Sequence, residues 1–203
     1  LLVAIVVGVG TGIISAYYKD TLIGFSAMSL GMIGLSMPAF FFGLVLIRVF
    51  AVKLRWVPVL GFGDWRDLIL PALCLGLIQA TSLSRVTRSS MLDVLNQEYV
   101  RTARAKGLGE QLVVFRHALA NALLPVITII GLQVGYLLGG TFIIEIIFGW
   151  HGIGELAVRA ILWRDFTITQ GIILISAATY VFVNLFVDIL YTYLDPRVSY
   201  SSD

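Results

Sequence analysis

Charged residues are scarce in this chain. Only 13% of its 203 residues are Asp, Glu, Lys or Arg, whereas 59% are hydrophobic, and the mean hydropathy is +0.95. About a quarter of the residues in a soluble domain are charged, so this composition excludes an ordinary soluble domain. Several apolar runs reach the roughly 20 residues that a helix needs to cross the bilayer core. The sequence therefore predicts an integral membrane protein.

Cysteine and histidine are also rare, and the residue spacings typical of catalytic sites do not occur. The single cysteine, Cys74, excludes an intramolecular disulfide and lies in an apolar run, where packing is its expected role. The two histidines, His117 and His151, fall on opposite sides of the membrane in the topology below, so they cannot share a metal. No Ser/His/Asp arrangement occurs, and no GxxxxGK[ST] loop that would cradle a nucleotide. We expect no enzyme activity, no metal and no ATP bound by this chain.

The apolar runs are continuous rather than alternating, which favours helices over the strands of a barrel. We predict an all-α, polytopic transmembrane bundle, with residues 1–203 forming one domain. No basic region precedes the first run, so it is not a signal peptide, and we expect a further N-terminal portion before Leu1. The five predicted spans are 1–17, 25–52 (bent at Pro38), 68–83, 119–148 and 168–193. The motif "GVGTG" in the first span is interpreted as helix packing, because it lacks phosphate-loop spacing.

Cations predict the orientation of these spans, since Lys and Arg are commoner on the cytoplasmic side. Lys19, the polar loop 84–117 and Arg197 share one face, and that face has more Lys and Arg than the other. On the opposite face the cations are offset by nearby acids. The loop 84–117 is therefore predicted to be cytoplasmic, with Trp65 and His151 outside, in a multi-pass protein of the cytoplasmic (inner) membrane.

The loop itself is predicted to be helix, glycine, helix. Residues 97–106 favour a helix with Asn96 as its N-cap, and Gly107 suits the left-handed C-cap. A second helix is expected to start near Glu110 and to run to Pro125.

Tyr99, Ala103 and Gly107 are spaced by four and share a face of the first helix, which suits close docking of a partner. The alternative is a basic amphipathic helix resting on anionic lipid, although no strong apolar face is present.

The segments "EYVRTARAKGL" and "HALANALLPVIT" resemble the EAA-type loop of ABC importer permeases, and specifically the peptide/nickel branch. "SMPAFFFGLVLIRVFAVKLRWVPVLGFGD", "VTRSSMLDVL", "GLQVGYLLGGTFIIEIIF" and "VNLFVDILYTYLDPR" extend the resemblance over nearly the whole chain. It implies a type I importer permease core whose loop sits in a cleft of a cytoplasmic ATPase and transmits ATP-driven closure. The ATPase-coupling residues implied are Glu98, Tyr99, Arg101, Thr102, Ala103, Arg104, Ala105, Lys106 and Gly107.

The same resemblance implies the partners. These are a second permease subunit, two ATPase domains or subunits that bind ATP and Mg²⁺, and an extracytoplasmic substrate-binding protein, all in a lipid bilayer and without nucleic acid. It also implies that a first span and a large extracytoplasmic segment are missing from the N-terminus. The chain departs from the pattern at two places. His151 replaces the proline of a usual Trp-Pro-Gly, which predicts a less rigid outer turn, and Ala120 stands where arginine is common.

Four further features have competing interpretations. Gly131, Gly135 and Gly139 form a small-residue stripe for close helix packing, within this subunit or against a partner, or are simply tolerated. Glu145 is an acid at membrane depth and a gate candidate. Its alternative is an interfacial carboxylate paired with a helix end or with a cation such as Arg48, which could instead snorkel. Asp188 is expected to cap or pair structurally.

The predicted function is import of di- or oligopeptides by alternating access. Nickel chelates, glutathione and oligosaccharides remain alternatives, because permeases of this family that carry them look alike. A secondary transporter would need ion-coupling acids and broken helices in matched halves, which the sequence lacks. A purely structural membrane subunit would not need a docking loop.

Overall fold

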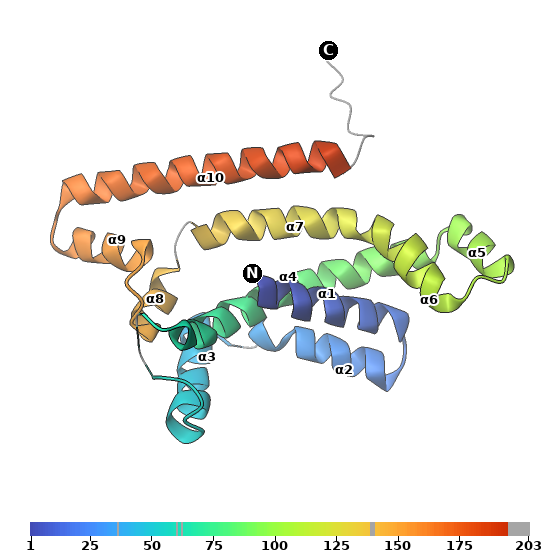
Figure 1. The fold of residues 1–203 in the computed structure, drawn as a ribbon, viewed down its shortest axis with the longest axis horizontal. Coiled ribbons are helices and arrows are strands. Elements are labelled where there is room, and N and C mark those ends of the chain that lie inside the picture. The colour runs from blue at the N-terminus through green and yellow to red at the C-terminus, as the bar shows by residue number, and fades with distance from the viewer. Residues whose placement is uncertain (36, 60, 62, 139–140, 195–203) are drawn as a thin grey trace, which may run out of the picture.

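The computed structural model describes residues 1–35, 37–59, 61, 63–138 and 141–194, and this part of the chain contains helices and no strand (Figure 1). The all-α prediction is therefore confirmed. The α-helices are α1 (Leu2–Tyr17), α2 (Leu22–Gly31), α3 (Ala39–Leu46), α4 (Ile69–Leu95), α5 (Glu98–Ala105), α6 (Glu110–Leu112), α7 (Ala120–Leu138), α8 (Phe142–Phe148), α9 (Ile153–Leu162) and α10 (Phe166–Leu194). Two π-helical turns, Ile47–Lys53 and Val113–Leu119, extend α3 and join α6 to α7.

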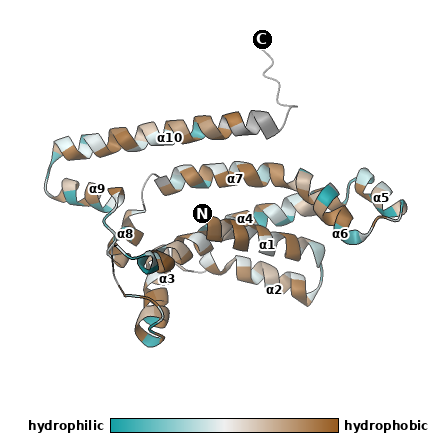
Figure 2. Cartoon of the chain, viewed as in Figure 1, coloured by the Kyte–Doolittle hydropathy of each residue, from teal (hydrophilic) through white to brown (hydrophobic). Residues whose placement is uncertain are grey.

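Three helical stretches in the described residues are long and apolar enough to cross a membrane. They are Trp65–Leu95, Glu110–Leu137 and Phe166–Val187, and α1 and α2 are shorter apolar helices. Apolar residues extend along α1, α7 and α10, whereas hydrophilic residues gather around α5 and α6 at one end of the bundle (Figure 2). The predicted spans at 1–17 and 168–193 thus correspond to single helices, and the other three differ in their bounds.

The span predicted at 25–52 is two separate helices rather than one bent helix. Helix α2 ends at Gly31, and α3 begins only after Pro38, whose ring and missing N–H disfavour helix at and before it. A Cβ at Gly34 would clash with the backbone carbonyl of Leu77, so the connecting segment passes directly over α4. The connection contains a short 3₁₀ helix, Ile33–Leu35, in place of the continuous bent helix that the sequence predicted.

The span predicted to end at Leu83 continues as helix to Leu95. The polar residues beyond Leu83 had indicated a loop, but in the helix they lie on different faces, some buried and some exposed. Ser84 and Thr87 are buried and Arg85 is exposed. Ser84 accepts a hydrogen bond from the Thr11 hydroxyl on α1, with 2.9 Å between the oxygens. Helix α4 therefore projects beyond its apolar part toward α5.

Glycines bring α1 and α4 into close contact. A Cβ at Gly8 would lie 2.7 Å from the carbonyl oxygen of Ala80, and one at Gly12 would lie 2.5 Å from Cβ of Thr87. The packing interpretation of "GVGTG" is confirmed, because both glycines face α4 without room for a side chain. Small residues allow this approach of two membrane helices.

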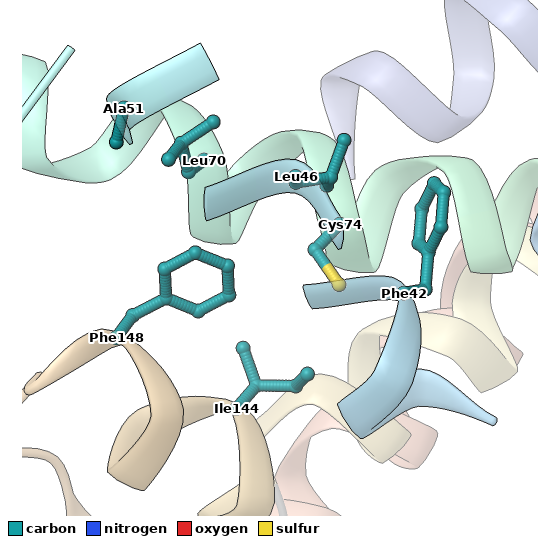
Figure 3. Close-up of a cluster of buried hydrophobic side chains, with 7 residues drawn as sticks. All are labelled: Phe42, Leu46, Ala51, Leu70, Cys74, Ile144 and Phe148. Carbon is teal, nitrogen blue, oxygen red and sulfur yellow. The ribbon is translucent and has the colours of Figure 1, made fainter. Parts of the chain in front are cut away.

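At the opposite end from α5, a hydrophobic cluster joins α3, α4 and α8 (Figure 3). Cys74 is fully buried there, so its predicted packing role is confirmed. The cluster consists of Phe42, Leu46, Ala51, Leu70, Cys74, Ile144 and Phe148.

The span predicted at 119–148 is interrupted. Helix α7 ends at Leu138, and Thr141 has a non-helical backbone with φ −113° and ψ 59° before α8 begins. The sequence Gly139–Gly140 precedes this point, and glycine is a weak helix former. Gly139, the third member of the predicted stripe, lies outside the described residues, as does Arg197.

Candidate functional site

The loop predicted from the sequence forms a compact helical corner at one end of the bundle (Figure 1). Helix α5 begins after Gln97 and no side chain caps it. The prediction of Asn96 as its N-cap is wrong, because Asn96 Nδ2 donates to the carbonyl of Leu92, 2.8 Å away, and closes α4 instead. Gly107 has φ +78°, as its predicted left-handed cap requires, and its N–H donates to the carbonyl of Arg104.

One face of α5 is buried against the chain itself. Val100 is fully buried and Ala103 is 7% exposed, and both pack against Val113 at the start of the π-helical turn. Tyr99, by contrast, is 45% exposed. The face predicted from Tyr99, Ala103 and Gly107 is therefore divided, with the tyrosine and glycine accessible and the alanine enclosed. Of the residues predicted to couple to an ATPase, those exposed are Glu98, Tyr99, Arg101, Thr102, Arg104, Ala105, Lys106 and Gly107.

An ion pair closes the corner across Gly107. Arg104 Nε donates to Glu110 Oε2 at 3.1 Å, and Arg104 Nη2 donates to Glu110 Oε1 at 2.7 Å. The Arg104 guanidinium holds the pKa of Glu110 below its ordinary value, mainly through these hydrogen bonds. Both side chains are 41% exposed, so the pair contributes at most about 1 kcal/mol. The contact is bidentate, and it bridges α5 and α6 on the two sides of Gly107.

The helix leaving the corner connects it directly to a membrane span. The predicted helix from Glu110 to Pro125 is present as α6, the π-helical turn Val113–Leu119 and the start of α7, which contains Pro125. The helical stretch Glu110–Leu137 is long and apolar enough to cross the bilayer. The corner is therefore continuous with a helical stretch that is long enough to cross the bilayer.

Exposed apolar side chains beside the corner were missed from the sequence. Leu108, Leu112 and Phe115 are 36%, 42% and 60% exposed. Phe115 also lines a hollow of about 250 Å³ with Tyr17 and Tyr18 from the end of α1. In the sequence these residues are visible as isolated apolar positions within a polar stretch. Their exposure could not be predicted, because it depends on how α1 packs against the π-helical turn.

At the other end of the bundle, Glu145 is bonded to a helix end. Its Oε2 accepts the backbone N–H of Glu155 in the first turn of α9, 2.7 Å away. A Cβ at Gly152 would lie 2.6 to 2.8 Å from the carboxylate atoms, so a side chain there would force the carboxylate to shift. Arg48 is exposed, and no ion pair joins it to Glu145 among the residues described. Of the two pairing partners considered for Glu145, a helix end and a cation, the structure shows the helix end.

The first turn of α9 also contains a small ion cluster. Arg159 pairs with Glu155, and His151 Nδ1 lies 3.3 Å from Glu155 Oε2. Hydrogen bonding by Arg159, and secondly by His151, lowers the pKa of Glu155. His151 therefore links its turn to α9 through Glu155. The sequence comparison, in which His151 replaces a proline, had predicted only a less rigid turn and not this contact.

The glycine stripe of α7 packs within this chain. A Cβ at Gly131 would lie 2.5 Å from Val187 Cγ1, and one at Gly135 would lie 3.2 Å from the ring of Tyr180. Both contacts are with α10. The side chains of His117 and Asp188 lie outside the described residues.

Comparison with known proteins identifies the family. The sequence profile of the family described as binding-protein-dependent transport system inner membrane component matches residues 8–200. The glutathione transport system permease protein GsiC of Escherichia coli (strain K12) is 42% identical over 197 residues, and that of Pectobacterium atrosepticum (strain SCRI 1043) is 43% identical. These alignments cover 97% of this chain and 64% of each relative, so the chain spans less than two thirds of their length.

Solved structures share the fold. A chain of the MetNI methionine ABC transporter in inward-facing conformations matches with a TM-score of 0.78 over 96% of this chain and 88% of that chain. A second crystal form of the same transporter gives a TM-score of 0.76. Sequence identity is 14% in both, so the likeness concerns the fold alone. With residues 8–200 matching the family profile, this chain belongs to the family of binding-protein-dependent transport system inner membrane components.

Proposed function

We propose that this chain is the permease subunit of an ATP-driven importer of short peptides, with glutathione, itself a tripeptide, among its substrates. Membership of the inner membrane transport family supports the class of protein and its place in the inner membrane. The glutathione permeases that are 42–43% identical support a peptide substrate. Nickel chelates and oligosaccharides are less well supported, because no relative cited above carries them.

The observation that carries the coupling role is the rigid corner. Helix α5 is fixed by burial of Val100 and Ala103 against Val113 and by the Arg104–Glu110 pair. Residues at its exposed surface, including Tyr99, Arg101 and Lys106, are free to contact a partner ATPase. Movement of that ATPase would rotate α5, and the helical stretch Glu110–Leu137 would carry the rotation into the membrane.

The partners follow from this role. Two ATPase domains or subunits would bind ATP and Mg²⁺, whereas this chain would bind neither. A second permease subunit would complete the path, and an extracytoplasmic binding protein would deliver the peptide. Glu145 would act at the outer end by holding α9 in place, and so would contribute to closing the outer gate.

Uptake by the assembled importer tests the proposal. The full-length protein would be purified with its co-purifying subunits, whose identity mass spectrometry would give, and reconstituted in proteoliposomes with the binding protein. We expect ATP-dependent uptake of labelled glutathione or trialanine, and none without ATP. Purification without any ATPase, or uptake of neither peptide, would contradict the proposal.

A further inference from the structure

The side chain of one glutamine contacts the backbone of another where α4 packs against α7. Gln133 on α7 is only 6% exposed, and its Nε2 donates to the backbone carbonyl of Gln79 on α4, 3.0 Å away. Within the described part of the chain, Gln133 Oε1 and Gln79 Nε2 are buried without any hydrogen-bond partner. Each unpaired buried group costs about 1–3 kcal/mol, and polar groups at membrane depth are candidates for function. The contact therefore leaves one glutamine donor and one glutamine acceptor available to a ligand.

The two unpaired groups are one acceptor and one donor. Gln133 Oε1 accepts only, and Gln79 Nε2 donates only. A peptide group offers the complementary pair, one N–H and one carbonyl oxygen. A charged ligand group would leave one of the two glutamine atoms unmatched.

A hollow adjoins Gln79. It has a volume of about 120 Å³, and its polar wall is formed by Gln79, Tyr136 and Thr141, while the remaining lining is apolar. A water molecule takes about 30 Å³ in the liquid, so the hollow is larger than one water needs. No Asp, Glu, Lys or Arg is among the described residues that line it. Its chemistry suits a small apolar side chain attached to an uncharged backbone.

Tyr136, which lines the hollow together with Gln79, is open to the surface. It lies three residues after Gln133 on α7, and its side chain is 66% exposed. Thr141 follows at the interruption between α7 and α8. The hollow thus has Gln79, one partner of the buried contact, and the exposed Tyr136 in its wall.

We propose that Gln79 and Gln133 bind a peptide group of the substrate as it crosses the membrane, an inference that rests on the proposed function. Gln79 Nε2 donates to the peptide carbonyl, and Gln133 Oε1 accepts the peptide N–H. Both atoms are covered in the present conformation, so the peptide reaches them when α4 and α7 part during the transport cycle. The permease then recognises the peptide backbone and not a particular side chain.

Methylation of a peptide nitrogen removes the N–H and gives a selective probe. Uptake by the reconstituted importer would be measured for trialanine and glutathione, each unmodified and with its last peptide nitrogen methylated. The ratio of unmodified to methylated uptake includes discrimination by the binding protein, which is the same for every permease variant. A change in this ratio between variants therefore reports the permease alone.

Two variants separate the two hydrogen bonds. Gln133→Met removes the acceptor, so the ratio should fall about five- to tenfold, as expected for one hydrogen bond. Gln79→Met removes the donor but leaves the backbone carbonyl that Gln133 contacts. Uptake of both forms should then fall about five- to tenfold with the ratio unchanged. The matched control is Gln170→Met, the same change at an exposed position of α10, which should alter neither quantity.

Either an unchanged ratio in Gln133→Met or normal uptake in Gln79→Met overturns the inference that the two glutamines bind one peptide group. If Gln133→Met fails to accumulate in the membrane, Gln79→Met decides alone, and normal uptake in it overturns the inference. If the unaltered importer carries neither peptide, the proposed function fails, and this inference fails with it.

Discussion

The Glu145 carboxylate holds the first turn of α9 through Glu155, whose backbone nitrogen lies 2.7 Å from Glu145 Oε2. Unpaired amides and the helix dipole both favour an anion at this position. Helix α8, which contains Glu145, also packs against α3, and α9 packs against α10. One carboxylate therefore connects α8 to α9, and through them α3 to α10, at the end of the bundle opposite α5.

Removing this carboxylate should loosen the outer end. In Glu145→Leu, α9 loses its anchor at a cost of about 1 kcal/mol, which corresponds to about fivefold in a conformational equilibrium. We expect ATP hydrolysis by the assembled importer without peptide to rise by about that factor. Glu145→Gln keeps an acceptor oxygen and should change the rate less. Normal basal and peptide-stimulated hydrolysis in Glu145→Leu would show that the carboxylate is only structural.

Gly152→Ala should reproduce this effect without touching the acid. The added Cβ would lie 2.6 to 2.8 Å from the Glu145 carboxylate and would displace it from α9. Gly171→Ala is the matched control, because a Cβ there meets no atom within 4 Å. Basal ATP hydrolysis should rise in Gly152→Ala and stay normal in Gly171→Ala. Equal rates in the two variants would mean that the contact adapts without consequence.

Sequence reasoning predicted the helix class, the helical corner and its glycine cap, because these depend on composition and local conformation. It did not predict that Ala103 is enclosed, since this depends on how Val113 returns across α5. The continuation of α4 to Leu95 was also missed. Ser84 and Thr87 are polar and so suggested a loop, but both are buried on α4 against α1. The glutamine contact between α4 and α7 could not be predicted from the sequence, because residues 79 and 133 are far apart in the chain.

The Arg104–Glu110 pair should contribute little to stability but more to coupling. We expect a double-mutant cycle with Arg104→Ala and Glu110→Ala to give an interaction free energy of about 0.5–1 kcal/mol in thermal unfolding of the purified importer. Because the folded-state pKa of Glu110 is lowered, this contribution is present at neutral pH and is lost as the pH falls through that pKa.

Exchanging the two charges tests the coupling role of the same pair. Arg104→Glu alone should lower peptide-stimulated ATP hydrolysis, and adding Glu110→Arg should restore part of it. If the double variant is no better than the single one, the ion pair has no role in orienting α5.

Thiol labelling tests the orientation. Lys19 and the corner are predicted to face the cytoplasm, and the segment before Trp65 to face outward. In a Cys74→Ala background, Val59→Cys should react with a membrane-impermeant maleimide in intact cells, because Val59 is exposed. Gly109→Cys should react only after the cells are opened, and a Cβ there meets no neighbour. Labelling of Gly109→Cys in intact cells would reverse the topology.

Ala103→Asp should disconnect the ATPase without preventing membrane insertion. The added carboxylate would be enclosed by Val100 and Val113. Because burying an unpaired charge costs several kcal/mol, α5 should move out of its contact with Val113. Insertion should persist, because Ala103 lies outside the long apolar helices. The matched control is Gly109→Asp, which adds the same charge at an exposed position outside these helices, where a Cβ meets no neighbour within 4 Å. Membrane abundance, recovery of the ATPase and peptide uptake would be measured together. Normal ATPase recovery and uptake in Ala103→Asp, at normal abundance, would contradict a coupling role for α5.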